Sequence, residues 1–295
     1  MPRALSAAAA PDKRAVRRSY ERAAGAYDAH AVLHREVGKR LAEHLDPIRI
    51  EPRRIVDLGC GTGAAFEALA RRFPRASVVG VDFARAMLER ARRRVPAWRR
   101  WLGAARPALV CADAVRLPLA NACADLIVSN LALQWCDAQS VFAEAGRVLP
   151  AGGLFLFSTL GPDTLKELRA AFRAADDAAH VNEFVDMHDL GDALVHAGFA
   201  DPVMEMEVVT LEYADMGALA RDLKAVGAHN ALAGRPRGLV GRARWQRVAA
   251  SYERARRDAV LPASYEVIYG HAWKTAPRRL ADGRQVIDVV RGGRP

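Results

Sequence analysis

Short apolar segments alternate with segments of helical composition in the middle of this chain, and this alternation limits the possible folds more than any other feature. The predicted strands occupy residues 54–58, 77–82, 108–113, 124–130 and 152–158. Helices are predicted between them at 64–72, around Met87 and Leu88, and at 139–149. Strands separated by helices at this spacing pair in parallel through crossover connections. The sequence therefore predicts an α/β fold with a Rossmann-like, doubly wound and mostly parallel sheet.

Further helices are predicted on both sides of this core. Residues 12–46 carry apolar side chains at helical spacing and end at Pro47. Beyond residue 160, helices are predicted at 163–175, 187–197 and 216–259, and strands at 203–213 and 285–290. Ligands of open α/β sheets bind at the carboxyl ends of the strands. We expect the late strands to join the sheet edge, and the helices of 161–200 and 215–260 to form a cap over that crevice.

These patterns divide the chain into four parts. They are a flexible tail at 1–11, a core with N-terminal helices at 12–160, a helical cap with an edge strand at 161–260, and strands that complete the sheet at 261–295. The tail contains an alanine run but no apolar core followed by a cleavage signature, so we do not expect a signal peptide.

The composition is that of a globular chain. Its 295 residues are 51% hydrophobic and 26% charged, which suits one large domain with an elaboration. No stretch approaches 18 uninterrupted apolar residues, so no membrane span is predicted. The cysteines form no C-x-x-C pair and no histidine cluster has zinc spacing, so no metal site is predicted. Scattered thiols without a signal predict a reducing compartment, the cytoplasm.

The net charge of +10 arises from 44 basic and 34 acidic residues. Only five of the 44 are Lys, which leaves 39 Arg, and this preference extends over the whole chain. Runs such as Arg92–Arg94 therefore indicate a solvated helix face. They are not accompanied by a nucleic-acid-binding motif, so no nucleic acid is predicted as a ligand. A basic surface would still attract an acidic protein partner.

A glycine-rich loop follows the first predicted strand. Gly59-Cys-Gly61-Thr-Gly63-Ala64 fits G-x-G-x-G, the dinucleotide pattern G-x-G-x-x-G/A, and a strand-to-helix turn without a ligand. Asp57 favours one ligand class, because it lies two residues before the first glycine. A pyrophosphate needs a bare helix N-terminus, whereas the sulfonium and ammonium groups of S-adenosylmethionine suit an anionic strand end.

Acidic residues also end the next two predicted strands. Asp82, 25 residues after Asp57, is placed to accept hydrogen bonds from both ribose hydroxyls. Asp113 is placed to accept one from the exocyclic amine of adenine. A single acidic residue at a strand end is commonly a helix N-cap. Three of them at successive strand ends, beside a glycine loop, indicate an adenosyl ligand.

Several segments of the core resemble the motifs of class I S-adenosylmethionine-dependent methyltransferases. They are Val56–Gly63, Gly80–Asp82, Ala112–Ala114 and Asp125–Trp135. The resemblance covers 54–158 and is specific to the superfamily, not to a substrate. It implies S-adenosyl-L-methionine as the cofactor. The residues that it and the preceding arguments assign to cofactor binding are Asp57, Gly59, Gly61, Gly63, Asp82, Asp113, Ala114 and Asn130.

Four segments outside the core carry a second resemblance, and they are Asp12–Ala31, Gly161–Arg169, Asp186–Asp192 and Leu261–Trp273. They are similar to the malonyl-acyl-carrier-protein O-methyltransferases of biotin synthesis, and the similarity covers nearly the whole chain. This implies methylation of the free carboxylate of malonyl-carrier protein. The ester masks the charge, so that the fatty-acid elongation machinery accepts the product as a primer toward pimeloyl.

The residues are compatible with this chemistry. A carboxylate is already a nucleophile at neutral pH, so the lack of a Ser/His/Asp or Cys/His constellation is expected. The protein must align the reacting atoms and exclude water. Tyr20 and Tyr27 lie seven residues apart on one helical face. We consider them as candidate catalytic residues that contact the carboxylate or the methionine end of the cofactor, or alternatively as packing aromatics.

Other polar residues have simpler explanations. Asp186 and Asp189 are expected to begin a helix, although with His188 and Asp192 they could be taken for a metal site. His271 and Trp273 are expected to pack on a strand. Arg169 and Arg173, after residue 160, are candidates for docking an acidic carrier protein, or else plain solvated surface.

Three other functions remain open from the sequence. An arginine hydroxylase-type assembly factor of respiratory complex I resembles the chain in 161–169, 189–199 and 261–273, but not in the helix of Tyr20 and Tyr27. A module that senses the cofactor without turnover is a second alternative, and a methyltransferase of small molecules is a third. The sequence does not determine the oligomeric state.

Overall fold

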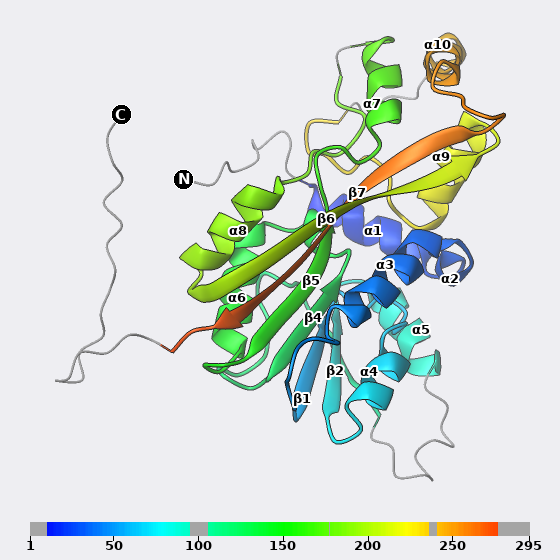
Figure 1. The fold of residues 1–295 in the computed structure, drawn as a ribbon. Helices are drawn as coiled ribbons and strands as arrows, with labels where there is room; N and C mark the ends of the chain where they lie inside the picture. The colour runs from blue at the N-terminus through cyan, green and yellow to red at the C-terminus, as the bar shows by residue number, and fades with distance from the viewer. Residues whose placement is uncertain (1–10, 95–105, 177, 236–240, 277–295) are drawn as a thin grey trace, which may run out of the picture.

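The structure, a computed structural model, describes residues 11–94, 106–176, 178–235 and 241–276 (Figure 1). The predicted strand at 285–290 lies outside the described residues, as does the predicted tail except for Pro11. The described part forms one seven-stranded sheet with helices on both faces and a group of helices beyond one end (Figure 1). Among its helices, none is long and apolar enough to cross a bilayer.

The sheet is parallel through its first five strands. The strands are β1 (Arg54–Leu58), β2 (Ser77–Asp82), β3 (Ala108–Cys111), β4 (Leu126–Asn130), β5 (Leu154–Leu160), β6 (Phe199–Tyr213) and β7 (Leu261–Lys274). Their order is β3-β2-β1-β4-β5-β7-β6. The predicted parallel pairing of β1 to β5 is confirmed, and β7 pairs antiparallel with β5 and β6. The order reverses between β1 and β4, so a crevice is expected at their carboxyl ends.

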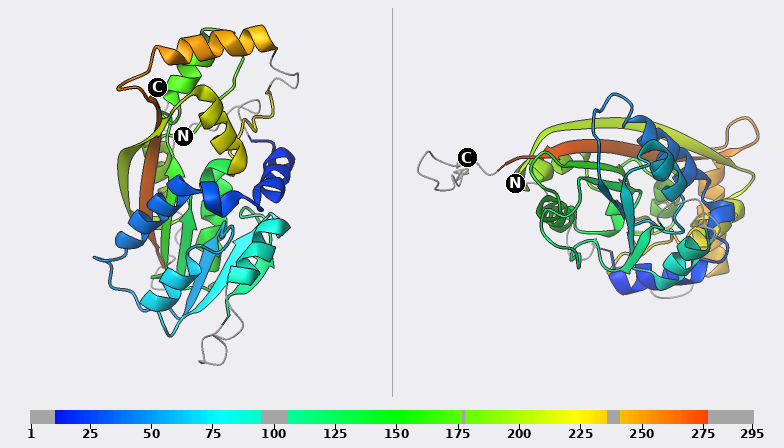
Figure 2. Two further views of the ribbon diagram at one scale, coloured as in Figure 1. Left: turned by 90° about the vertical axis from the view of Figure 1, so that its right-hand side faces the viewer. Right: turned by 90° about the horizontal axis from the view of Figure 1, so that it is seen from below.

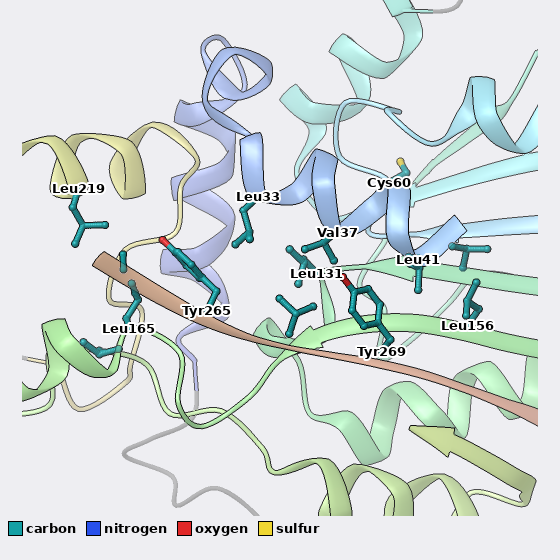
Figure 3. Packing of buried hydrophobic residues seen from close by; sticks show 14 of the residues in the cluster. Leu33, Val37, Leu41, Cys60, Leu131, Leu156, Leu165, Leu219, Tyr265 and Tyr269 are labelled. Carbon is teal, nitrogen blue, oxygen red and sulfur yellow. The ribbon is translucent and has the colours of Figure 1, made fainter. Parts of the chain in front are cut away.

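Helices cover the sheet on both faces (Figure 2). One face carries α3 (Val32–Glu43), α4 (Phe66–Arg72) and α5 (Arg85–Arg94), and the other carries α6 (Ala138–Val148) and α8 (Met187–His196). Central strands buried on both faces are apolar along their length, as the burial of β4 and β5 shows. In Figure 3, Leu33, Val37 and Leu41 of α3 point toward Leu156 of β5 and Tyr269 of β7.

The two late strands form a long antiparallel ribbon. β6 has 15 residues and β7 has 14, and they pair from Phe199 with Lys274 to Tyr213 with Leu261. The expected addition at the sheet edge is confirmed for the predicted strand 203–213, which lies within the outermost strand β6, whereas the strand beside β5 is β7, a segment other than the predicted 285–290. β7 is buried along most of its length, whereas β6 alternates between half-buried and exposed residues, as an edge strand does.

The far end of this ribbon reaches into the group of helices beyond the sheet. These helices are α7 (Lys166–Arg173), α9 (Met216–Ala225) and α10 (Arg242–Glu253) (Figures 1 and 2). α7 packs against α10 and β7, and the Tyr252 hydroxyl of α10 donates to the Pro262 carbonyl at 2.7 Å. α8 was expected in this cap. It lies instead on the sheet, because its buried Leu190, Ala193 and Leu194 pack with α6 and β6.

The N-terminal region is helical as predicted, in three pieces. α1 (Lys13–Ala23) begins after Asp12, whose carboxylate accepts the Ala15 N–H at 3.1 Å. The short α2 (Tyr27–His30) follows, and α3 then packs on the sheet. α1 contacts α5, so it lies across the carboxyl ends of the strands (Figure 1). The helices before β1 therefore cover the crevice that the strand order creates.

Candidate active site

A cavity, here called the strand-end cavity, opens at the carboxyl ends of β1, β2 and β4. The loops after these strands form its floor, and α1 and α2 contribute to its walls. The residues predicted from sequence that line it are Tyr20, Tyr27, Gly59, Gly61, Asp82, Asp113, Ala114 and Asn130. Asp57 and Gly63 are not among the lining residues. The structure therefore brings most of the predicted residues to one place.

The three glycines of the loop after β1 all have left-handed backbone conformations, with φ of +77°, +52° and +76°. A Cβ at Gly59 would lie 2.3 Å from the Ala132 Cβ, and one at Gly63 would lie 2.5 Å from the Phe66 ring. A Cβ at Gly61 would meet no atom within 4 Å. Gly59 and Gly63 therefore permit close packing of the loop, whereas Gly61 leaves its backbone open to the cavity.

Asp82, the last residue of β2, ties the glycine loop to the start of α5. The Gly61 N–H donates to its Oδ2 at 2.9 Å and the Ala84 N–H donates to its Oδ1 at 2.8 Å. Burial raises the pKa of Asp82 to about 6, although these hydrogen bonds act in the opposite direction. Each carboxylate oxygen retains lone-pair capacity, so Asp82 can also accept hydrogen bonds from ligand hydroxyls.

Asp57 is a buried carboxylate with an unsatisfied oxygen. Its residue is 3% exposed, and within the described part of the chain Oδ2 has no hydrogen-bond partner. Burial, and then the nearby charge of Asp82, raise the pKa of Asp57 to about 7. An unpaired buried charge is costly. A cationic ligand group in the adjoining cavity would reduce that cost.

Asp113 reaches the strand-end cavity but already has a partner. The Lys13 Nζ of α1 donates to both of its carboxylate oxygens, at 2.9 and 2.6 Å. Each side chain is 38% exposed. The Val115 N–H also donates to Asp113 Oδ1 at 3.2 Å. The sequence analysis did not identify Lys13, because the pair joins residues 100 positions apart.

Asn130, the last residue of β4, is held by hydrogen bonds on both sides of its amide. Its Nδ2 donates to the His34 carbonyl at 2.9 Å, and its Oδ1 accepts from the Ser158 hydroxyl at 2.8 Å. The amide thus links α3 to the ends of β4 and β5. Asn130 and Ala114 both line the cavity, so their predicted position at a ligand is consistent with the structure.

Tyr20 and Tyr27 lie side by side at the cavity wall, with ring centroids 6.3 Å apart. The Tyr20 ring meets the Trp135 ring edge-on at 6.0 Å, and the Tyr27 ring lies 5.5 Å from that of His34. Burial raises the pKa of both hydroxyls, so they are protonated donors at neutral pH. The arrangement accommodates both expected roles, packing and contact with a ligand.

Hydrogen bonds fix α1 to the start of α5, and α2 to the glycine loop. The Glu21 carboxylate accepts the backbone N–H groups of Arg85 and Ala86 at 2.8 and 2.9 Å, which caps the N-terminus of α5. The Asp28 carboxylate accepts from the Thr62 hydroxyl in the glycine loop and from Arg94, both at 2.6 Å. Tyr20 and Tyr27 are therefore carried on helices that are tied to the loop itself.

A second, largely apolar cavity, here called the cap cavity, lies among the helices beyond the sheet. Its lining includes Thr164, Leu168, Phe172, Asn182, Met216, Leu219, His229, Trp245 and Tyr265. Figure 3 shows Leu165, Leu219 and Tyr265, three of its lining residues, close together. Trp135 lines both cavities, so the two adjoin at this side chain. A cap was expected from the sequence but this cavity was not, because its walls come from segments that are distant along the chain.

The remaining sequence candidates are structural in the described parts of the chain. Asp186 caps α8 as expected, accepting the His188 N–H at 2.8 Å, and no group of three or more His, Cys, Asp or Glu able to hold a metal is found among the described residues. Arg169 was expected as a docking candidate. Its guanidinium is instead half-buried and donates to the carbonyls of Pro162, Thr164 and Asn182. Arg173 is exposed.

Known proteins share both the sequence and the fold. Residues 56–157 match the family model described as a methyltransferase domain. The chain is 52% identical to the malonyl-[acyl-carrier protein] O-methyltransferase of Gallionella capsiferriformans over 94% of this chain and 96% of that one. It is 55% identical to that of Laribacter hongkongensis, over 94% and 95%. The fold is like that of the YcgJ protein from Bacillus subtilis, with TM-score 0.56, 16% identity, and 82% and 99% of the two chains covered.

Proposed function

Since this chain belongs to the family of malonyl-[acyl-carrier protein] O-methyltransferases, we propose that it transfers a methyl group from S-adenosyl-L-methionine to the free carboxylate of malonyl-acyl carrier protein. The product is the methyl ester that enters the synthesis of pimeloyl and biotin. One observation carries the proposal. A strand-end cavity with acidic residues adjoins an apolar cap cavity at Trp135, so a cationic methyl donor and an acyl thioester can meet there.

The strand-end cavity has the donors and acceptors that S-adenosylmethionine requires. Gly61 leaves its backbone open to a close ligand, and Asp82 would accept from the ribose hydroxyls. The charge of the buried Asp57 would favour the cationic methionine end. Asp113, Ala114 and Asn130 would complete the site, with Asp113 held in place by its ion pair with Lys13. When bound, the cofactor supplies an electrophilic methyl group on a positively charged sulfur.

The protein's own residues have to orient the carboxylate and exclude water. Deprotonation by a general base is unnecessary, because a malonyl carboxylate is ionised at neutral pH. Tyr20 and Tyr27 present protonated hydroxyls at the wall between α1, α2 and the cavity. They would hold the carboxylate with one oxygen in line with the methyl group. The cover formed by α1 and α2 would limit access of water to the reacting atoms.

We propose α10 as the docking element for the acidic carrier protein. Trp245 of this helix lines the cap cavity, so α10 lies beside the proposed path of the acyl group. Arg242 and Arg247 of α10 are exposed, as is Arg173 of the adjoining α7. The complementary charge would steer the carrier protein to this end of the molecule. Arg169 was a docking candidate from the sequence, but its guanidinium donates to three backbone carbonyls. We therefore assign docking to the exposed Arg173, Arg242 and Arg247.

The remaining organisation follows from the same proposal. Residues 12–160 would bind the cofactor, and the helices within 161–260, apart from α8, would cover the substrate. The strand β7, from the part that begins at residue 261, completes the sheet. We place the enzyme in the cytoplasm, where scattered thiols such as those of this chain remain reduced.

The direct test is incubation with malonyl-carrier protein and S-adenosylmethionine, followed by intact mass spectrometry. We expect the carrier protein to gain the mass of one methylene unit, and we expect base hydrolysis of the new ester to remove it. Gain of one oxygen atom on an arginine of a protein substrate would favour the hydroxylase-type assembly factor. Equal turnover of free small carboxylates would favour a small-molecule methyltransferase, and binding without turnover would favour a sensor.

The role of the tyrosines has its own test. Tyr27→Phe should lower kcat by roughly 10-fold while leaving the Kd of S-adenosylmethionine within about twofold, since only a hydrogen bond to the carboxylate is lost. Tyr252→Phe provides a control, because that hydroxyl donates to the Pro262 carbonyl in the cap. A wild-type kcat for Tyr27→Phe would leave Tyr27 as a packing residue.

A further inference from the structure

Trp135 occupies the wall between the two cavities. It ends the short 3-10 helix η2 (Leu133–Trp135) that follows β4, and it is 8% exposed. Its neighbours in the packing cluster include Tyr20 and Met87, which also line the strand-end cavity. Because the side chain lines the cap cavity as well, it lies where the methyl donor and the acyl group would meet.

The indole N–H of Trp135 is buried and unsatisfied. Its Nε1 has no hydrogen-bond partner among the described residues. Buried donors in native proteins are nearly always paired, so such a group calls for an explanation. The Tyr20 hydroxyl lies beside it, close enough for the indole N–H to lower the pKa that burial and the charge of Asp82 raise, although the two groups do not meet hydrogen-bond geometry. Two uncharged donors thus lie close together at the junction of the cavities.

Few other side chains near Trp135 could bind a carboxylate. Among the described residues that line the cap cavity, none is Lys or Arg. The His229 pKa is lowered by burial and by Arg22, Arg235 and Lys224, and its ring already contacts the Ser19 hydroxyl. His180 is bonded to Asp176. In the strand-end cavity, Lys13 is paired with Asp113. Neutral donors are therefore the groups available at the junction.

We propose that the Trp135 indole N–H and the Tyr20 hydroxyl together bind one oxygen of the substrate carboxylate, leaving the other oxygen free to attack the methyl group. This rests on the proposed function, and it makes Trp135 a substrate-binding residue. Uncharged donors orient the carboxylate. A cationic side chain that formed an ion pair with it would also withdraw negative charge from the attacking oxygen. Specificity for an acid over a neutral acyl group follows, because the two donors form stronger hydrogen bonds with a charged carboxylate oxygen than with a neutral carbonyl oxygen.

The test is Trp135→Phe, which removes the N–H and keeps an aromatic ring against Tyr20. We expect kcat/KM for malonyl-carrier protein to fall roughly 10-fold to 100-fold, with the Kd of S-adenosylmethionine within about twofold. Trp273→Phe is the matched control, since it makes the same change on β7, where Trp273 is not among the lining residues of either cavity, and should alter kcat/KM less than about threefold. Unchanged kcat/KM in Trp135→Phe would overturn the proposal.

A second measurement separates carboxylate binding from the shaping of the cavity. Acetyl-carrier protein lacks the carboxylate, so Trp135→Phe should weaken the inhibitory binding of a malonyl-carrier protein analogue but not that of acetyl-carrier protein. Equal weakening of both would show that Trp135 only shapes the cavity, and would overturn the inference.

The wild-type protein provides a test that does not require Trp135→Phe to fold. The indole ¹⁵N–¹H resonance of Trp135, assigned by exclusion with Phe variants of the other four tryptophans of the chain (Trp98, Trp101, Trp245 and Trp273), should shift with malonyl-carrier protein and not with acetyl-carrier protein. The same small shift with both would contradict the proposal. A wild-type enzyme that fails to methylate malonyl-carrier protein would instead refute the proposed function.

Discussion

Two buried carboxylates at adjacent strand ends control the electrostatics of this site. Asp82 has both oxygens occupied by backbone N–H groups, whereas Asp57 has an oxygen with no partner in the described structure. Both pKa values are raised, chiefly by burial. The two residues therefore respond differently to substitution. Substitution of Asp82 removes hydrogen bonds, whereas substitution of Asp57 removes a buried charge that has no compensating partner.

Asp82→Asn should weaken cofactor binding. Both oxygens of Asp82 accept a backbone N–H, so the NH₂ group of asparagine must face one of these donors and at least one hydrogen bond is lost, and the charge that strengthens the ribose contact is lost as well. We expect the Kd of S-adenosylmethionine, measured by calorimetry, to rise roughly 10-fold to 150-fold, which corresponds to about 1.5–3 kcal/mol. Asp125→Asn is the control, because that carboxylate also accepts two backbone N–H groups but lies at the opposite ends of the strands. Equal Kd values for both variants would exclude Asp82 from the ribose site.

Asp57→Asn should stabilise the ligand-free protein while weakening the cofactor complex. The pKa of Asp57 is about 7 in the folded protein, whereas its ordinary value is 3.8. The contribution of the protonated carboxyl to the free energy of unfolding is therefore fully present below about pH 4, and it is lost as the pH rises through about 7. The variant should therefore have the higher Tm at about pH 7.5, and this difference should shrink as the pH falls and vanish only below about pH 4.

The contribution of His34 to the pH dependence of folding stability has the opposite sign to that of Asp57. Burial lowers its pKa to about 4, so its stabilising effect is lost as the pH falls from about 6.5 to about 4. Subtracting the Tm of the wild type from that of Asp57→Asn at each pH cancels this contribution. A difference that does not change with pH would contradict the raised pKa of Asp57.

Among the helices, the short α1 contributes both to the strand-end cavity and to the capping of α5. It carries Lys13 and Tyr20 to the strand-end cavity, and its Glu21 caps α5. A helix of 11 residues is marginal in isolation. Its position therefore depends on these contacts with the rest of the fold.

Glu21→Ala should loosen this attachment. The loss of a cap at the N-terminus of α5 is expected to cost about 0.5–2 kcal/mol in the free energy of unfolding, measured by urea denaturation. We also expect a lower kcat, since Tyr20 lies one residue away on the same helix. Glu89→Ala is the matched control, because Glu89 of α5 forms only an exposed pair with Arg85 and should change stability by less than about 0.5 kcal/mol. Comparable losses in the two variants would argue against the capping role.

At the scale of the whole molecule, the exposed arginines of α10 lie at one end and those of α4 at the other (Figure 1). If the carrier protein docks on α10, Arg247→Glu should raise KM for malonyl-carrier protein by roughly 10-fold at about 0.05 M salt, and this effect should shrink at about 0.5 M. Arg71→Glu makes the same charge change on α4 and should have little effect. Equal effects of the two variants would indicate attraction by net charge alone.

Local patterns were sufficient to predict the parallel core, the N-terminal helices and the acidic strand ends, because hydrophobic spacing and glycine conformations depend on near neighbours in the chain. The resemblance of the flanking segments then identified the family, which the comparisons confirm. The same patterns predicted that α8 would belong to the cap. Its amphipathic spacing specifies a helix with one buried face, but not the surface on which that face packs.

The class of fold, the family and the residues around the glycine loop could thus be inferred from the amino-acid sequence. Four features became visible only in the folded protein: Lys13 pairs with Asp113, Glu21 caps α5, Arg169 donates to carbonyls near its own helix, and Trp135 lies between two cavities. The physical reason is distance along the chain. Periodicity records which side of an element is apolar, whereas a contact between remote side chains exists only once the packed helices and strands have set where each residue lies.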